Sequence, residues 1–385
     1  MKENVRLGRI AGIAVGFNWS LLVIAGLLAL TLAGSRFPVD APHYSSTAYT
    51  LAGLFTAVAF LAGVLAHEIS HALVARHDGL EVDGIVLWLM GGYTRITEQP
   101  KTPASELRIS AAGPLVSLLI GVVCGLLAVA GHWLGVSRLA VSVLTWLGMI
   151  NVLLAVFNML PGAPLDGGRV VHAAVWWRTG DRFRATRVAS RAGGYLGAGM
   201  VAFGIAALLG QWSSVDGLWL AIVGGFLMMA SRAEGGASAV LEALDGVAVR
   251  QVMATPGVGP GWLTVDAFLR EYAAGPLRPP AFLVEQWGSG LAGLAPTAAM
   301  EVIPYVRRGA ARAADFAIPI PQLPVVGPDK PASDAATSMS EKGAAWALVV
   351  ADGHIIGVLS LADMPAAAQR AKATPSPSPW ALTPH

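Results

Sequence analysis

The sequence has little cysteine and little charge. Its 385 residues include one cysteine, Cys124, and only 13% of them are Asp, Glu, Lys or Arg. A single cysteine excludes an intramolecular disulfide framework, and we expect Cys124 to be a small core or lipid-facing residue because it lies in an apolar run. The formal net charge is only +2, so no global basic field indicates a nucleic-acid partner.

Apolar residues are abundant instead and make up 55% of the chain, a composition typical of membrane proteins rather than soluble ones. They gather in six runs, each near the ~20 residues that a helix needs to cross the hydrocarbon core. The runs cover about 14–34, 47–75, 108–131, 137–161, 191–210 and 216–231. No small-residue cleavage site follows the first run convincingly, so we expect a retained span rather than a signal peptide.

Basic residues are concentrated in alternate connections between these runs. They precede the first run, separate the second from the third and the fourth from the fifth, and follow the sixth, whereas the other connections hold few. The positive-inside rule then places both termini in the cytoplasm. The even number of runs independently places both termini on the same side and agrees with this orientation.

The character of the sequence changes after Arg232. Residues 233–248 are small and mildly acidic, which is typical of a linker, and from Val249 the apolar runs shorten to strand length, as in AFLVEQ and AWALVVADG. Helix-like stretches lie between them, so we predict a soluble α+β domain in two halves. The end of the chain is rich in Pro and Ser and is predicted to be disordered.

The segment VLAHEISHALVAR, Val64–Arg76, places three ionisable side chains at the end of an apolar run. On a helix, His67 and His71 lie on one face and can hold one metal ion. Glu68 turns away from His71 but can reach a water beside the metal, accept its proton and pass that proton to a leaving amine. Because ionisable groups in membrane spans are costly and usually functional, we favour a zinc site over two satisfied core histidines.

The segment FNMLPGAPLDGGR offers a third metal ligand. Pro161 and Pro164 end the fourth apolar run, and irregular backbone at membrane depth is tolerated only where protein or a water-filled cavity surrounds it. Such a break can turn the carboxylate of Asp166 toward the two histidines. From spacing alone, a turn aspartate at the membrane surface explains Asp166 equally well.

Together, HEISH and LPGAPLDGGR resemble the two signatures of the site-2 protease family of intramembrane zinc metalloproteases. The chain looks most similar to the bacterial sporulation-factor-processing branch, which carries a C-terminal CBS domain pair. The resemblance implies one Zn²⁺ held by His67, His71 and Asp166, with Glu68 as the general base.

Asn158 in FNMLPG also matches a family position near the active site. A side-chain amide there can donate a hydrogen bond to the scissile carbonyl or its oxyanion. Asn151 lies seven residues earlier on the same helix face and is the alternative donor, while a polar contact between helices explains either residue without catalysis. The small residues of Ser110–Gly121 match a family element too, and we interpret them as a helix-packing surface.

The stretch LWLMGGYTRI, Leu87–Ile96, matches a further family feature. It is strand-like, is interrupted by Gly91 and Gly92, and predicts a membrane-associated β-hairpin with an exposed edge strand. That edge can bind an unwound substrate segment by β-addition. A membrane-embedded hairpin without a substrate role is the alternative.

The soluble part resembles a pair of CBS modules, which bind adenine nucleotides in the clefts between them. Ser360 and Asp363 match the S-x-x-D element that holds ribose, since a carboxylate accepts two hydrogen bonds. The first module has Met300 where the aspartate belongs. The resemblance therefore implies at most one site for ATP or AMP and a homodimer formed through the CBS modules. The alternative is a structural module without a ligand.

The sequence thus predicts about six transmembrane helices, a membrane-associated β-hairpin and a soluble α+β CBS-pair domain. The expected function is that of a zinc endopeptidase in a bacterial plasma membrane that cuts membrane-spanning substrates, by family analogy membrane-tethered transcription regulators. A nucleotide-gated transporter or channel is the alternative, but it would spread polar residues over several spans. The expected segments are the protease domain 1–232, the linker 233–248, CBS modules at 249–308 and 309–370, and the tail 371–385.

Overall fold

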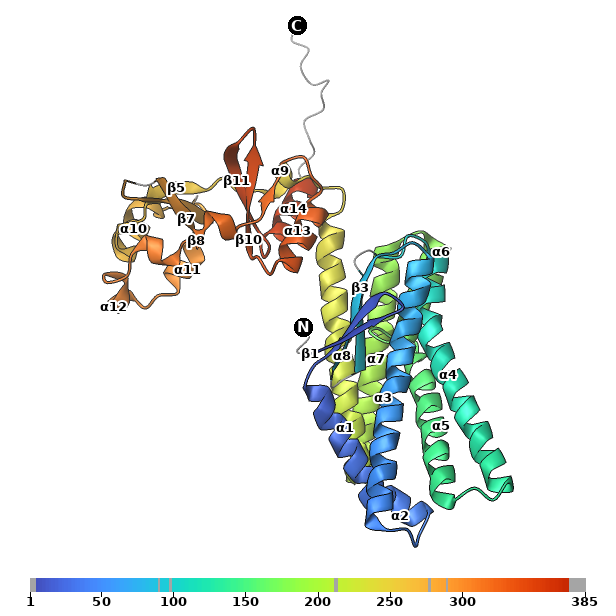
Figure 1. Cartoon of the computed structure of the whole chain (residues 1–385). Coiled ribbons are helices and arrows are strands. Elements are labelled where there is room, and N and C mark those ends of the chain that lie inside the picture. Colours follow the sequence, from blue (N-terminus) through green and yellow to red (C-terminus); the bar gives the residue numbers. More distant parts are fainter. Residues whose placement is uncertain are drawn as a thin grey trace. The chain divides into compact units, whose positions relative to one another are not determined.

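The computed structural model describes residues 5–88, 91–96, 99–210, 214–275, 278–288 and 290–373. The chain divides into two compact units, Met1–Gly236 and Ala237–His385. The first unit is mainly helical with one small sheet, and the second contains two small sheets with short helices around them (Figure 1).

Long helices make up most of the first unit. They are α1 (Ser20–Thr31), α2 (Phe37–Asp40), α3 (Ser46–His77), α4 (Pro103–Trp133), α5 (Arg138–Asn158), α6 (Asp166–Thr179), α7 (Arg182–Leu209) and α8 (Ser214–Leu244), and the π-helical segment Leu32–Arg36 joins α1 to α2. Within the described residues, five helical segments are long and apolar enough to cross a membrane: Ser20–Asp40, α3, α4, α5 and α7. Helix α8 covers the sixth predicted run.

The outward faces of these helices are apolar. Leu51, Leu119 and Leu126 are each more than 60% exposed, which is unfavourable in water but is expected of side chains that face lipid. The predicted multi-span helical architecture is confirmed.

Local sequence explains where the helices begin and end. The side chains of Ser45, Thr102 and Ser137 each accept a hydrogen bond from the backbone N–H three residues later, and so cap α3, α4 and α5. Pro103 follows its cap at the first helical position, where no N–H is needed. Gly180, in the left-handed conformation, ends α6.

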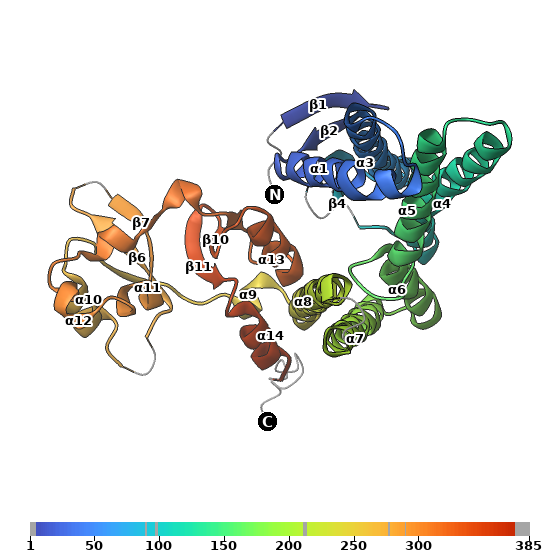
Figure 2. The same cartoon turned by 90° about the horizontal axis from the view of Figure 1, so that it is seen from below.

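A four-stranded sheet packs against α1 and α3 (Figure 2). Its strands are β1 (Val5–Ile10), β2 (Ile13–Phe17), β3 (Val82–Trp88) and β4 (Gly91–Ile96), in the order β1-β2-β3-β4. Strands β3 and β4 form the predicted hairpin and β4 lies at the edge, although the predicted residues 89 and 90 lie outside the described part of the chain.

The sequence analysis was wrong about residues 14–17, which belong to strand β2 and not to the first span. Gly12, at φ +81°, turns β1 into β2, and β2 pairs in parallel with β3. A short apolar run fits a buried strand or a helix equally well, and only the distant partner β3 decides between them.

Several helices extend beyond the apolar runs. Asp181 caps α7, which begins at Arg182, and α6 lies within the basic connection between the fourth and fifth runs. Residues 233–244, expected to be a linker, continue helix α8. Ala, Glu, Leu and Arg favour helix regardless of hydrophobicity, so an apolar run underestimates the length of its helix.

The second unit repeats one topology. The first half contains β5 (Gly257–Pro260), α10 (Val265–Tyr272), β6 (Ala281–Gln286), β7 (Gly290–Pro296), α11 (Thr297–Glu301), α12 (Tyr305–Arg308) and β8 (Ile318–Pro319). The second contains β9 (Val325–Val326), α13 (Ala332–Glu341), β10 (Trp346–Ala351), β11 (His354–Ser360) and α14 (Met364–Ala373), while α9 (Val249–Val252) precedes both. In each half, a parallel pair of strands is followed by an antiparallel hairpin. The predicted α+β architecture is confirmed.

Candidate metal centre

Two helices bring three metal-binding side chains together in the first unit. Helix α3 carries His67 and His71, and Asp166 is the first residue of α6. The two Nε2 atoms lie 3.1 Å apart, and Asp166 Oδ2 lies 3.3 Å from that of His67 and 3.4 Å from that of His71. Both histidines are buried and the aspartate is partly buried.

The turn before α6 places Asp166. A Cβ on Gly167 would lie 2.4 Å from the carbonyl oxygens of Leu160 and Met159, so this turn is too tight for a side chain. Two further helices hold the turn: Ala163 N–H donates to Ala189 O of α7, and Ser231 of α8 donates to Ala163 O. The break in the fourth apolar run therefore directs the carboxylate toward the histidines, as the sequence analysis expected.

Each histidine has an outer ring nitrogen, Nδ1, that contacts α4 and an inner one, Nε2, that faces the other histidine. The partner of Nδ1 decides whether Nε2 can donate or accept a hydrogen bond. His71 Nδ1 lies 2.6 Å from Ile109 O, and because a carbonyl only accepts, Nδ1 carries the proton. In a neutral ring His71 Nε2 is then an acceptor, facing His67 Nε2 and a carboxylate oxygen. His67 Nδ1 contacts Ser117 Oγ at 2.9 Å. A hydroxyl can donate or accept, and His67 Nε2 is an acceptor when Nδ1 donates to Ser117.

Three acceptors that face one another repel unless positive charge lies between them. A tetrahedral zinc ion with ligands at 2.0–2.1 Å places its ligand atoms roughly 3.3–3.4 Å apart. The separations of 3.1, 3.3 and 3.4 Å match that geometry closely. The residues present therefore fit a zinc ion.

Helix α4 leaves space for such an ion at Gly113. A Cβ on Gly113 would lie 2.2 Å from His71 Nε2 and 2.5 Å from His67 Nε2. The sequence analysis interpreted this part of α4 as a packing surface and missed both Gly113 and Ser117. Ile109, Gly113 and Ser117 follow one another at intervals of four residues along one helix face, and this spacing is the signal that could have found them.

Strand β4 lies against the side chain of Glu68. Thr94 Oγ1 donates a hydrogen bond of 2.8 Å to Glu68 Oε2, and a Cβ on Gly92 would lie 2.1 Å from Glu68 Cγ. Gly91, at φ +127°, has nothing within 4 Å of its Cβ position. Of the two glycines assigned to substrate, only Gly92 contacts the predicted base.

The two candidate asparagines have different surroundings. Asn151 is 1% exposed; its Nδ2 donates to Leu147 O, and its Oδ1 faces Gly63, one turn before His67. Asn158 is the last residue of α5 and is half-buried. Asn151 thus packs between helices, and the assignment of a carbonyl donor to Asn158 stays a prediction.

A second histidine cluster, which the sequence analysis missed, joins α4, α6 and α7. His172 Nδ1 lies 2.7 Å from Glu106 Oε2, and His172 Nε2 lies 3.1 Å from Thr186 Oγ1. Thr186 donates its own proton to Arg182 O, so it accepts from His172. We call these three residues, Glu106, His172 and Thr186, the helix clamp, because each lies on a different helix.

A polar contact also fixes the end of α3 to α4. Ser105 Oγ donates to Asp78 Oδ2 at 2.5 Å, and Arg108 Nη2 lies 2.9 Å from both carboxylate oxygens. The hydrogen bond from Ser105, together with the guanidinium of Arg108, holds the pKa of Asp78 below its ordinary value.

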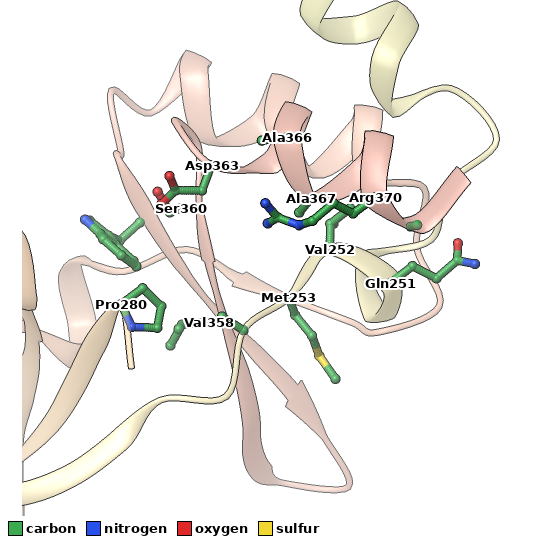
Figure 3. A pocket seen from close by; sticks show the side chains of 13 residues that line it. Gln251, Val252, Met253, Pro280, Val358, Ser360, Asp363, Ala366, Ala367 and Arg370 are labelled. Atoms are coloured by element: carbon green, nitrogen blue, oxygen red, sulfur yellow. The ribbon is translucent and has the colours of Figure 1, made fainter. Parts of the chain in front are cut away.

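The second unit has a cavity of about 540 Å³ that includes the predicted nucleotide residues Ser360 and Asp363. These two side chains lie on one side of the cavity, and the Arg370 side chain points toward them from α14 (Figure 3). Met300, which stands where the aspartate of a second nucleotide site would be, is fully buried in the core of the first half.

The chain is similar to two protein families and to several individual proteins. The model of peptidase family M50 matches residues 55–137 and 125–200, and that of the CBS domain matches residues 313–367. A protein of Mycobacterium tuberculosis named "Putative zinc metalloprotease Rip3" is 36% identical over 94% of this chain and 92% of its own length. A Synechocystis protein with the same kind of name is 31% identical over 79% of each chain. Among solved structures, the site-2 protease from Methanocaldococcus jannaschii is similar over 60% of this chain and 94% of its own, with 24% identity and a TM-score of 0.40.

Proposed function

The chain belongs to peptidase family M50, the site-2 protease family of zinc metalloproteases, and on that basis we propose that it hydrolyses peptide bonds of membrane-spanning proteins within the bilayer. The observation that carries this proposal is the buried set of three acceptors from His67, His71 and Asp166, spaced for one zinc ion. It lies in a unit that has, among its described residues, five helical segments long and apolar enough to cross a membrane. Family membership favours this function over a nucleotide-gated transporter.

Each residue of the centre has a distinct task in the proposed reaction. His67, His71 and Asp166 would hold a zinc ion, which when bound would polarise the scissile carbonyl and lower the pKa of water. Glu68 takes a proton from the attacking water and passes it to the leaving amine as the C–N bond breaks. Asn158 donates its amide to the developing oxyanion, with Asn151 as the alternative donor.

The ring orientation is supplied by α4. Ile109 O and Ser117 Oγ bind the outer nitrogens of the two imidazoles, so that both inner nitrogens face the same point before any ion arrives. Such partners of metal-binding histidines fix the tautomer and the ring plane.

The substrate enters as an extended strand in this proposal. A helical substrate hides its peptide bonds in internal hydrogen bonds, so it must unwind before attack. Strand β4, at the edge of its sheet, offers a partner for the unwound segment, with Gly91 and Gly92 nearest its start. We propose a membrane-tethered transcription regulator as the substrate class.

The proposed location is a bacterial plasma membrane with both termini in the cytoplasm. The basic connections predict this orientation. In the cytoplasm, the two halves of the second unit would form a homodimer and bind ATP or AMP; they were predicted as CBS modules at 249–308 and 309–370, whereas the structure divides them between β8 and β9. Ser360 and Asp363 would hold the ribose and Arg370 would face the phosphates, since all three line one cavity.

Co-expression with candidate single-span regulators, followed by mapping of the cut, tests the proposed activity. The Glu68→Gln variant should retain about one zinc per chain and lose cleavage, because the amide cannot accept the proton. Glu81→Gln, at an exposed loop carboxylate, is the matched control and should cleave normally. An active Glu68→Gln enzyme, or purified protein without zinc, would contradict the proposal.

Calorimetry with AMP and ATP tests the nucleotide site separately. Wild type should bind one nucleotide per chain, and Asp363→Ala should weaken binding by about tenfold or more because charge-assisted hydrogen bonds to the ribose are lost. Equal binding by both proteins would exclude the assigned residues.

A further inference from the structure

The face of strand β4 that meets α3 is built around the side chain of Glu68. Side chains alternate along a strand, so Gly92 and Thr94 lie on the same face. Gly92 has no side chain where a Cβ would reach Glu68 Cγ, and Thr94 Oγ1 lies 2.8 Å from Glu68 Oε2. Position 92 makes room for the glutamate, and position 94 binds it.

The direction of this hydrogen bond follows from the chemistry of its partners. An ionised carboxylate has no proton to give, so the Thr94 hydroxyl donates and Glu68 Oε2 accepts. Hydrogen bonds to charged groups are shorter and stronger than neutral ones. One oxygen of the carboxylate is thereby fixed, while Oε1 stays available to a reacting water.

This contact restricts a side chain that is otherwise flexible. A glutamate loses considerable rotamer entropy when it is held in one orientation, and α3 by itself leaves the outer torsions of Glu68 free to vary. A general base must lie within hydrogen-bond reach of the proton that it takes. Thr94 therefore supplies an orientation that the H-E-x-x-H helix alone does not.

The same strand forms one edge of its sheet. Within the described residues β4 pairs with β3 on one side only. A peptide strand added to the other side would run about 4.8 Å from β4. The peptide bonds of the substrate would then be in register with β4, whose Thr94 side chain binds Glu68.

We propose that Thr94 is a positioning residue that couples docking of a substrate strand on β4 to the orientation of Glu68. This inference rests on the proposed proteolytic function and adds a residue to it. The hydroxyl of Thr94 acts through Glu68 and not on the scissile peptide bond. Edge pairing and base alignment thereby become properties of one strand, so a peptide docked elsewhere on the unit would meet a base that is not aligned with it.

Kinetics of two variants in the full-length, detergent-purified protein test this role, with the substrate identified by co-expression. Thr94→Val keeps the shape but removes the donor, and it should lower kcat about ten- to hundredfold, as expected for loss of a hydrogen bond to a charged group. KM should change less than about twofold, because Thr94→Val leaves unchanged the backbone edge of β4 that pairs with the substrate. Thr94→Ser restores the hydroxyl and should recover most of kcat.

Two measurements separate this effect from misfolding. Zinc content should stay at about one per chain in both variants, since Thr94 contacts none of the metal-binding residues. Acetohydroxamate would bind a zinc ion at this site through its oxygens and would give its proton to the neighbouring Glu68 carboxylate. Its affinity, measured by calorimetry without any substrate, should fall in Thr94→Val and return in Thr94→Ser.

The outcomes distinguish this inference from the function beneath it. Unchanged or raised kcat in Thr94→Val overturns the inference alone if Glu68→Gln is inactive. Equal loss in Thr94→Val and Thr94→Ser, with normal zinc, also overturns it, because the hydroxyl would then not matter. A fully active Glu68→Gln enzyme overturns the proposed function itself.

Discussion

Two buried histidine clusters lie in the same helical unit and have opposite chemistry. In the helix clamp both nitrogens of His172 have partners that accept: Glu106 on one side, and on the other Thr186, whose own proton goes to a backbone carbonyl. In the metal centre the outer nitrogens have partners, but the inner nitrogens of His67 and His71 face only each other and Asp166.

This difference separates a structural histidine from a metal-binding one. The clamp is complete without any ion because each donor meets an acceptor. In the metal centre, when both rings donate from Nδ1, three acceptors converge on one point and need a cation. The unsatisfied acceptors, rather than the mere presence of histidine, indicate where an ion belongs.

The largest expected effect comes from filling the space in the metal centre. Gly113→Ala would place a methyl group between the two Nε2 atoms, so stoichiometric zinc and cleavage should both be lost. Gly125→Ala, on the same helix with nothing within 4 Å of its Cβ position, is the control and should keep both. Zinc analysis of the two purified proteins measures this. One zinc per chain in Gly113→Ala would contradict the assignment of the metal centre and with it the contrast to the helix clamp.

Removing the carboxylate from the clamp should destabilise the fold while leaving the metal in place. Glu106→Ala strands a buried imidazole and should cost about 3 kcal/mol, because Glu106 and His172 side chains are only 6% and 13% exposed. Thermal unfolding in detergent measures this loss. Glu106→Gln keeps an acceptor and should lose less. A clamp variant that loses zinc but not stability would show that the two clusters are not separate.

Removing the partner that orients the His67 ring should lower the affinity for zinc without unfolding the protein. Ser117→Ala removes the partner of His67 Nδ1, and partners of this kind typically contribute about tenfold or more to metal affinity. Competition with a chelator measures that affinity. An unchanged zinc dissociation constant would mean that α4 does not orient His67.

The smallest effect should come from Asp78, which lies outside both clusters. The hydrogen bond from Ser105 holds its native pKa below the ordinary value of 3.8. A lowered native pKa gives stability that is present above the unfolded pKa and is lost as pH falls through the native one. The thermal unfolding temperature of wild type should therefore fall on acidification below about pH 4 more than that of Asp78→Asn. Parallel pH profiles of the two unfolding temperatures would contradict this.

Short-range patterns in the sequence were sufficient to predict much of this protein. His67, Glu68 and His71 lie within one helical turn or so, so local geometry alone gathers these three. Asp166 follows a proline-broken segment far along the chain, and its role was implied by the family resemblance rather than by spacing. The apolar runs predicted the long helices. Strand β2 was misread because its partner β3 is about seventy residues away.

The residues that the sequence analysis missed share one property. Ser117 and Gly113 meet the histidines across about fifty residues of chain, Glu106 meets His172 across sixty-six, and Thr94 meets Glu68 across twenty-six. No helical or strand periodicity connects positions at such distances. Only the packing of α4 and β4 on α3, and of α6 on α4, brings them together.

The sequence by itself determined which residues can bind a metal and which helices can face lipid, because both depend on side-chain chemistry repeated at helical spacing. Tertiary structure decided which way each imidazole points, what leaves room for an ion and what holds the base. Orientation depends on hydrogen-bond partners from distant segments, and those partners exist only after the helices and the sheet have packed.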